Sequence, residues 1–191
     1  MVAVLETIEA THGPVALGFF NAGVAPYVKG GALDIDAFRQ AVEINIMGVV
    51  HGLAPLLEKM VRRGRGQVAV NASTAGYGGL PQAAAYGASK AAMIHMCEAL
   101  KFDCDNLGIR LQVVNPGFVD TPLTAKNTFP MPFLVSMDMA ALRVVDGFER
   151  GGFEITFPRR LSWILKTLNL LPYPLYFFIV AWATGWSAKK I

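Results

Sequence analysis

The chain has 191 residues, of which 53% are hydrophobic and only 16% are charged. This length and composition exclude an intrinsically disordered protein and fit one domain that can bury a sizeable core. The net charge of +3 is too small to indicate nucleic-acid binding, and we interpret Arg62, Arg63 and Arg65 as a solvated turn.

Two kinds of apolar segment alternate along the chain. Residues 1–11 are predicted to form a short amphipathic helix, and residues 15–23 a strand covered on both faces. Asp34 is the expected N-cap of a helix that ends near Met60. Further strands are predicted at residues 67–72, 111–114 and 153–157, and further helices at 86–109 and 137–148. Such alternation is typical of a parallel sheet in an α/β fold.

The cysteines and histidines give no sign of a disulfide or a metal site. Cys97 and Cys104 fall seven residues apart in one predicted helix, so we interpret them as reduced core residues of a cytoplasmic protein. His12, His51 and His95 lack metal-like spacing with cysteines or carboxylates. The sequence therefore predicts that no metal takes part.

Tyr86 and Lys90 are the strongest indication of chemistry. Residues four apart lie on one face of a helix, so the phenol and the ammonium group are expected to be neighbours. A nearby positive charge favours the phenolate and lowers the pKa of the tyrosine. Acid–base catalysis works best when that pKa lies near the working pH, so the pair is a candidate proton-transfer device.

Other polar and small residues stand near predicted strand ends or inside apolar helices. Ser73 follows the strand 67–70, and Asn45 interrupts an apolar helix. The remaining segments are Asn21-Ala22-Gly23 and Asn115-Pro116-Gly117-Phe118-Val119-Asp120-Thr121. In this order and spacing, over roughly residues 13–158, the set closely resembles the short-chain dehydrogenase/reductase family.

The resemblance implies a doubly wound, Rossmann-like parallel sheet with three layers, α/β/α. It also implies an oxidoreductase that transfers a hydride between NAD(P) and an alcohol or carbonyl substrate, and a homo-oligomer when full length. NAD and NADP both stay open, because the sequence shows no residue that would choose between them.

The same resemblance assigns roles to particular residues. Tyr86 would exchange a proton with the substrate oxygen, and Lys90 would lower its pKa and bind the nicotinamide ribose. Ser73 would hydrogen-bond the substrate oxygen, and Asn45 would hold a water that relays protons to Lys90. The implied cofactor-binding residues are Asn21, Ala22, Gly23, Tyr86, Lys90, Pro116, Gly117, Val119 and Thr121. The implied substrate-binding residues are Ser73, Phe118, Leu123 and Phe129, whose mostly apolar character suits an apolar substrate.

The sequence departs from the family pattern in two places. It contains no glycine-rich turn of the form Thr-Gly-x-x-x-Gly-x-Gly, which in relatives holds the dinucleotide pyrophosphate at a helix N-terminus. By the same comparison three strands and two helices are missing, so we expect a fragment of a longer enzyme; a true short protein is the alternative. Phe20 also stands where the family usually has an asparagine.

The last 31 residues, 161–191, are predicted to be an apolar tail outside a partial catalytic domain of residues 1–160. Pro172 and Pro174 divide the tail into two pieces, and residues 175–186 are too short to span about 30 Å of hydrocarbon. A continuous span of residues 161–186, kinked at the prolines, is the last-ranked alternative. Its aromatic residues and Lys189-Lys190 suit a peripheral membrane contact, and an arm that completes the pocket or a subunit interface is the alternative. The competing function is a truncated, non-catalytic module for subunit interaction or membrane association.

Overall fold

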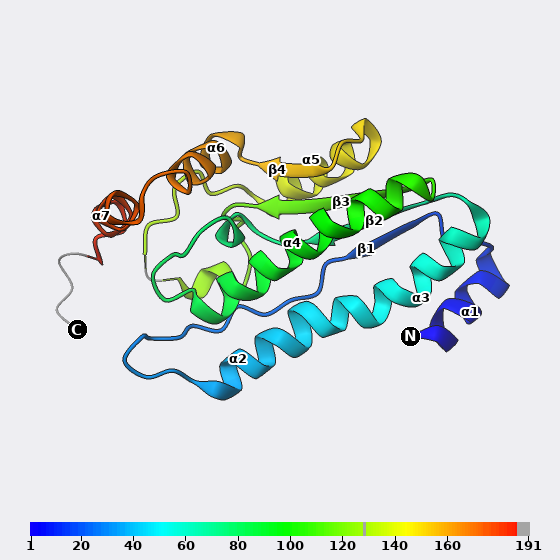
Figure 1. Cartoon of the computed structure of the whole chain (residues 1–191), viewed down its shortest axis with the longest axis horizontal. Coiled ribbons are helices and arrows are strands. Elements are labelled where there is room, and N and C mark those ends of the chain that lie inside the picture. Colours follow the sequence, from blue (N-terminus) through cyan, green and yellow to red (C-terminus); the bar gives the residue numbers. More distant parts are fainter. Residues whose placement is uncertain (128, 187–191) are drawn as a thin grey trace.

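The centre of the computed structural model is a parallel sheet of four strands, seen edge-on in Figure 1. The structure describes residues 1–127 and 129–186. The strands lie in chain order and are β1 (Leu17–Phe20), β2 (Gly66–Asn71), β3 (Ile109–Pro116) and β4 (Glu154–Phe157). Every neighbouring pair is parallel, with Val70 opposite Val113 in the register of the two central strands.

Helices cover both faces of this sheet, which gives the three layers in Figure 1. The helices are α1 (Val2–His12), α2 (Ile35–Ala41), α3 (Gly48–Arg63), α4 (Ala84–Asn106), α5 (Met137–Arg150), α6 (Arg159–Leu168) and α7 (Tyr173–Ala183), with a π-helix at Val42–Met47 and 3-10 turns at Thr74–Gly76 and Thr124–Lys126. Helices α3 and α4 pack on one face against Val68, Val70 and Leu111. Helix α5 packs on the other face against Ala69 and Val114. The predicted α/β architecture is confirmed.

Helices α2 and α3 are joined by the π-helical turn into one continuous helical rod. Asp34 caps it as predicted, accepting bonds from the Asp36 and Ala37 backbone N–H groups at 2.9 and 3.1 Å. The rod runs from Ile35 to Arg63, and its π-helical turn at Val42–Met47 was not predicted. By length and composition the rod could cross a membrane, but a helix buried against a core passes the same test, and 33% of its most apolar window is buried.

The core on the α3 and α4 face holds both cysteines. Cys97 and Cys104 are buried, free thiols, as the prediction of reduced core residues requires. Burial raises the pKa of the Cys97 thiol to about 12, so it stays protonated and unreactive at neutral pH. One predicted boundary was wrong: Ile109 belongs to β3, because α4 ends at Asn106 and Gly108 turns the chain at a φ of 72°.

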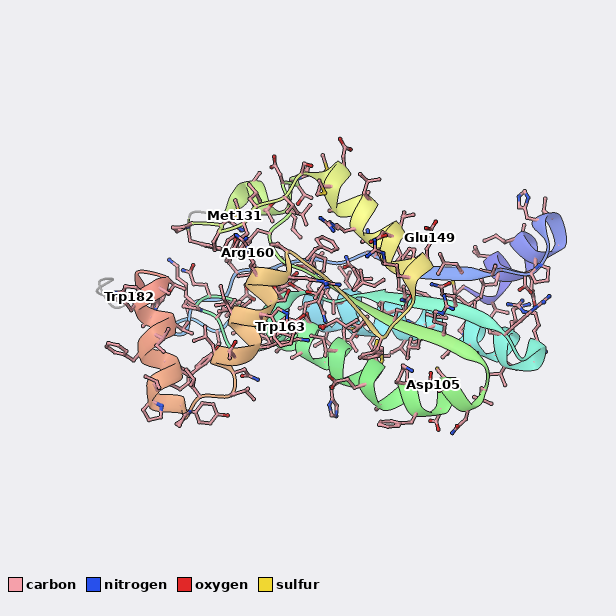
Figure 2. The ribbon with its side chains drawn as sticks, turned by 90° about the horizontal axis from the view of Figure 1, so that it is seen from above. Asp105, Met131, Glu149, Arg160, Trp163 and Trp182 are labelled. Atoms are coloured by element: carbon pink, nitrogen blue, oxygen red, sulfur yellow. The ribbon has the colours of Figure 1, made fainter. Side chains whose placement is uncertain are left out.

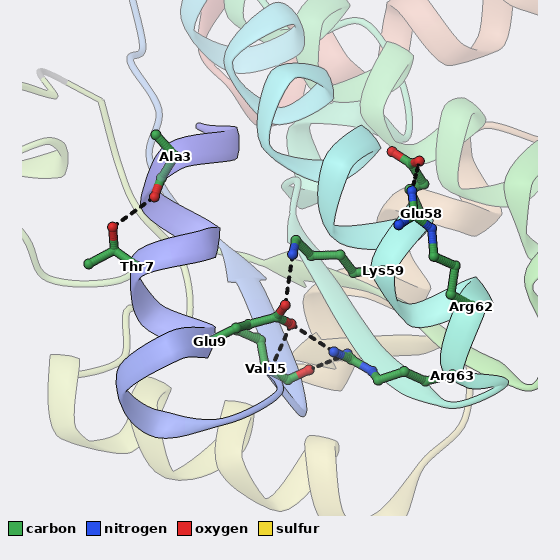
Figure 3. Close-up of polar contacts among 8 residues, drawn as sticks. All are labelled: Ala3, Thr7, Glu9, Val15, Glu58, Lys59, Arg62 and Arg63. Carbon is green, nitrogen blue, oxygen red and sulfur yellow. Dashed lines mark hydrogen bonds and ion pairs between the residues drawn. The ribbon is translucent and has the colours of Figure 1, made fainter.

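A carboxylate joins α1 to the end of α3, as Figure 3 shows. Glu9 lies 2.8 Å from the Lys59 ammonium and 2.7 Å from the Arg63 guanidinium, and Arg63 also donates to the carbonyl of Val15 at 2.7 Å. The hydrogen bond from Lys59 is the main cause that lowers the pKa of Glu9. The interpretation of Arg63 as part of a solvated turn was therefore wrong, because this side chain fixes the chain entering β1.

The predicted tail forms two helices that pack on the domain. Helix α6 begins two residues before the predicted boundary at residue 161, and Pro172 precedes α7. Lys166 pairs with Glu154 on β4, and the Tyr176 hydroxyl donates to the Gly79 carbonyl at 2.7 Å. Lys189 and Lys190 lie outside the described residues.

Candidate active site

The candidate catalytic residues gather at the carboxyl ends of the strands, where ligands bind in open α/β sheets. Ser73 follows β2 as N-cap of the turn Thr74–Gly76, with its Oγ accepting from the Ala75 N–H at 3.1 Å. This cap holds the hydroxyl at the strand end, where it also donates to the Pro116 carbonyl at 3.4 Å. Ser73 is buried and within hydrogen-bonding reach of the Tyr86 phenol, as predicted.

Tyr86 and Lys90 lie one turn apart at the start of α4. The Lys90 ammonium is 5.8 Å from the centre of the Tyr86 ring and donates to the carbonyl of Asn71 at 2.7 Å. Lys90 is only 4% exposed, so its charge is held inside the protein at the end of β2. The helical spacing in the sequence therefore produced the expected pair, and Asn71 is a partner that the sequence did not indicate.

The electrostatics of this pair differ from the expectation. Burial raises the pKa of Tyr86 above its ordinary value, and the hydrogen bond with Ser73 opposes that effect. Burial also lowers the pKa of Lys90 to about 8. The predicted lowering of the tyrosine pKa was wrong, because withdrawal of the phenol from water is the largest influence on it and raises it. At neutral pH the site holds a protonated phenol beside an ammonium group.

Asn45 joins the long helical rod to α4 through buried hydrogen bonds. Its amide nitrogen donates to the Ser89 hydroxyl at 2.8 Å and to the Val24 carbonyl at 2.9 Å, and its oxygen accepts from the Val24 N–H at 2.8 Å. Ser89 in turn donates to the backbone carbonyl of Tyr86 at 2.7 Å. Single π-helical turns often occur at functional sites, so the π-helical turn that contains Asn45 supports a functional role for this residue. Ser89 was missed, although its position three residues after Tyr86 could have indicated it.

Gly23 lies beside the side chains of both Asn45 and Lys90. A Cβ atom on Gly23 would lie 3.1 Å from Asn45 Oδ1 and 3.4 Å from the Lys90 ammonium nitrogen. The lack of a side chain therefore leaves room beside both polar groups. Asn21, Ala22 and Gly23 are exposed at the end of β1, where a ligand can approach the backbone.

Asn71 and Phe20 lie next to the segment Asn21-Ala22-Gly23. Asn71 donates to the Asn21 side-chain oxygen at 2.8 Å, but its own buried Oδ1 has no partner among the described residues. Phe20, the departure from the family pattern, packs against the core, and a Cβ on Gly52 would lie 2.4 Å from its ring. Gly52 therefore makes the space that this larger side chain needs.

Residues 117–124, which follow β3, also lie at the carboxyl ends of the strands. Gly117 donates to the Phe157 carbonyl at 2.8 Å, and a Cβ there would lie 2.7 Å from Leu161. The Thr124 hydroxyl holds the turn by donating to the Val119 carbonyl at 2.5 Å and accepting from the Thr121 N–H at 3.0 Å. The Val119 N–H has no hydrogen-bond partner among the described residues and is free to meet a ligand.

Of the three apolar residues predicted to bind substrate, Phe118 and Phe129 are in contact with each other. The rings of Phe118 and Phe129 meet edge to face with centroids 6.0 Å apart, so these two residues share one apolar region. Leu123 is 45% exposed. The side chain of Lys126 lies outside the described part of the structure.

A second, partly buried polar cluster forms around Glu154 and includes Tyr77 from the loop between Ser73 and Tyr86. The Tyr77 hydroxyl donates to Glu154 at 2.6 Å, and the Asn115 amide donates to the same carboxylate at 2.7 Å. Lys166 pairs with the other oxygen of Glu154, and its ammonium lies 5.0 Å from the centre of the Tyr77 ring. The sequence did not indicate this cluster, because its members come from four separate elements.

Known proteins share this fold and much of this sequence. A family model described as short chain dehydrogenase matches residues 1–130. An uncharacterized oxidoreductase of Myxococcus xanthus is 36% identical over 172 residues, which cover 90% of this chain and 68% of the relative. The chain belongs to the short-chain dehydrogenase family. The resemblance inferred from the Ser73, Tyr86 and Lys90 pattern is confirmed at the level of the family.

A second relative and a solved structure are also similar to this chain. An NADP-dependent (R)-specific alcohol dehydrogenase of Lentilactobacillus kefiri is 31% identical over 121 residues, which cover 62% of this chain and 48% of that enzyme. A short chain dehydrogenase of Burkholderia cenocepacia, solved in complex with NADP, has the same fold. That structure matches with a TM-score of 0.76 and 24% identity over 88% of this chain and 72% of its own. The chain thus spans about half the length of the Lentilactobacillus enzyme.

Proposed function

We propose that this protein catalyses NAD(P)-dependent interconversion of an apolar alcohol and the corresponding carbonyl compound. The observation that carries the proposal is the meeting of Ser73, Tyr86 and Lys90 at the carboxyl edge of the sheet. A phenol beside a second hydroxyl can give a proton to a substrate oxygen that takes the place of their mutual hydrogen bond and accepts from both. Oxidoreductase relatives in the same family support this reading of the geometry.

In the direction of carbonyl reduction, Tyr86 is the proton donor. Its raised pKa keeps the phenol protonated at neutral pH, so a proton is available as negative charge develops on the substrate oxygen. Ser73 donates a second hydrogen bond to that oxygen from a position fixed by the turn Thr74–Gly76. The positive charge of Lys90 stabilises the phenolate that remains, and the ammonium can pass one of its protons towards the phenolate and regain a proton from solvent through the space beside Asn45 and Gly23. Bound nicotinamide would supply the hydride.

Residues along the strand ends suit the nicotinamide half of such a cofactor. The Val119 N–H would donate to the carboxamide, with Pro116, Gly117 and Thr121 shaping the same turn. Lys90 would bind the ribose, and the exposed backbone of Asn21-Ala22-Gly23 leaves space for the remainder. The relatives favour NADP as the first cofactor to assay, with NAD as the alternative.

The substrate pocket is proposed to be apolar. Phe118 and Phe129 form its aromatic wall, and Leu123 stands at its rim. Within residues 118–135 the sequence has a single cation, Lys126, so this segment offers no pair of positive charges to hold a phosphate or a carboxylate. A neutral alcohol is therefore the substrate class to test first.

The test is an assay of the purified natural gene product with cyclohexanol and NADP⁺ or NAD⁺, followed by the fluorescence of the reduced cofactor. Tyr86→Phe should lower kcat by at least about 100-fold, because general acid–base catalysis contributes that much, and should leave cofactor affinity unchanged. Tyr77→Phe removes one hydroxyl from the adjoining loop and should retain most of the activity. Equal activity in the Tyr86→Phe variant and the parent would refute the assigned role.

A further inference from the structure

Helix α7 is apolar on every side and yet only partly covered. One side packs on the domain through Tyr176 and Val180, which are buried. The opposite side presents Phe177, Phe178 and Trp182, which are 58%, 72% and 74% exposed. A helix that is hydrophobic all round is normally enclosed by protein or lipid, so the outer side of α7 lacks a cover.

Exposed apolar residues are also present at the start of α7, just before it and on α6. Leu170 and Tyr173 are 82% and 76% exposed, and Trp163 and Ile164 on α6 are exposed as well. Figure 1 places α7 at the end of the molecule opposite α1, with α6 between α7 and β4, and Figure 2 labels Trp182 on α7 and Trp163 on α6. We call Phe177, Phe178, Trp182 and Leu175 the α7 face. Large exposed apolar surfaces mark sites of interaction with protein or membrane.

The charge of the surrounding sequence favours an anionic partner. Residues 155–191 contain no aspartate or glutamate. Their cations are Arg159, Arg160, Lys166, Lys189 and Lys190. Lys166 pairs with Glu154, so Arg159, Arg160, Lys189 and Lys190 give this stretch its excess of positive charge. Tryptophan, tyrosine and cationic residues around a short apolar helix are the composition that a lipid–water interface selects.

The geometry fixes α7 in place. The Tyr176 hydroxyl donates to the Gly79 carbonyl, and a Cβ on Gly78 would lie only 2.7 Å from that hydroxyl. Gly78 and Gly79 lie in the loop between Ser73 and Tyr86, so α7 is attached next to the candidate active site. Its 11 residues extend about 16 Å, which is too short to cross about 30 Å of hydrocarbon. The helix is therefore suited to lie in the plane of an interface.

We propose that the α7 face binds the surface of a bilayer that contains anionic phospholipid. The aromatic side chains enter the boundary between headgroups and acyl chains, while Arg159 and Arg160 add attraction to anionic headgroups. The contact with Gly79 then holds the loop of the active site close to the membrane, from which an apolar substrate can be taken. Membrane binding itself does not depend on the proposed reaction.

The experiment is flotation of the natural gene product with phosphatidylcholine vesicles, with and without added phosphatidylglycerol. The protein should float with the anionic vesicles and be released as salt increases, because salt screens headgroup attraction. Substituting Phe178→Ser and Trp182→Ser together should reduce binding at least about tenfold, because the change removes two exposed rings that lipid would bury. Phe102→Ser is the matched control, since Phe102 is 76% exposed on α4 and should not alter binding.

Three outcomes would overturn the proposal. The parent protein could fail to float with anionic vesicles, or the double variant could float as well as the parent. Light scattering could instead show a dimer that only the double variant loses, which would assign the α7 face to a second copy of this chain. The Arg160→Gln variant provides a test that leaves the apolar face intact, and it should weaken binding to anionic vesicles only. Circular dichroism checks that each variant is folded.

Discussion

We predict that Lys90 lowers the free energy of unfolding of the protein at neutral pH. Its pKa falls from an ordinary 10.5 to about 8 because it is buried, and a fall of that size corresponds to about 3 kcal/mol of lost stability for the charged form. Lys90→Met removes the charge and keeps an unbranched chain of similar length. The change also leaves the Asn71 carbonyl without its donor, which costs about 1–2 kcal/mol. The net prediction is a protein that is about 1–2 kcal/mol more stable at pH 7.

The stability difference between the parent and Lys90→Met should depend on pH in a definite direction. Since the pKa of Lys90 is lower in the folded state than in the unfolded state, the unfolded chain binds more protons between about pH 8 and 10.5. The stability of the parent protein therefore rises over that interval, while Lys90→Met lacks this contribution. The advantage of the variant should shrink as pH rises and reverse once the lysine is neutral in both states.

Urea unfolding followed by circular dichroism, at pH 7 and at about pH 9.5, measures both effects. Lys101→Met on the same helix is the control, because its surface pair with Asp105 should contribute under about 1 kcal/mol. The reasoning fails if Lys90→Met is less stable than the parent at pH 7, or if the difference between them does not change with pH. In the assay of turnover, the same variant should lose both activity and cofactor affinity.

Three further changes follow from the contacts described above. Glu9→Gln should lower the urea midpoint at neutral pH, and the difference should disappear as pH falls through the lowered pKa of the Glu9 carboxyl, which titration of the midpoint would show. Gly23→Ala should reduce kcat more than thermal stability, because the methyl group enters the space beside Asn45 and Lys90. Asn45→Ala should lower the unfolding free energy by about 2–4 kcal/mol, measured by urea unfolding, because both backbone groups of Val24 lose their partner.

Local patterns predicted most of the secondary structure. The apolar runs before Asn21 and around Val68 became parallel strands, and Asp34 capped its helix as expected. The spacing of Tyr86 and Lys90 placed both on one face of α4, because that relation depends only on helical geometry. The alternation of elements then determined the layers, since parallel strands need crossover helices.

Features that depend on distant parts of the chain could not be predicted. The bond from Lys90 to the Asn71 carbonyl joins residues 19 apart, and the bond from Asn45 to Ser89 joins residues 44 apart. The cluster around Glu154 draws residues from the loop, β3, β4 and α6. The π-helical turn also has no local signal, since its residues would fit an ordinary α-helix. The pKa of Tyr86 was mistaken for the same reason, because burial is a property of the whole fold.

The corrected pKa values change how the two directions of the proposed reaction compare. A tyrosine with a raised pKa is protonated at neutral pH, which is the state that carbonyl reduction needs, and it releases that proton less readily than a free tyrosine does. Alcohol oxidation needs the phenolate, and Lys90 is the buried cation nearest to it. Because the pKa of Lys90 is about 8, its charge fades as pH rises above that value, just where a base would otherwise become more available. The site therefore depends on Lys90 keeping its proton, which the Asn71 carbonyl favours by accepting a hydrogen bond from it.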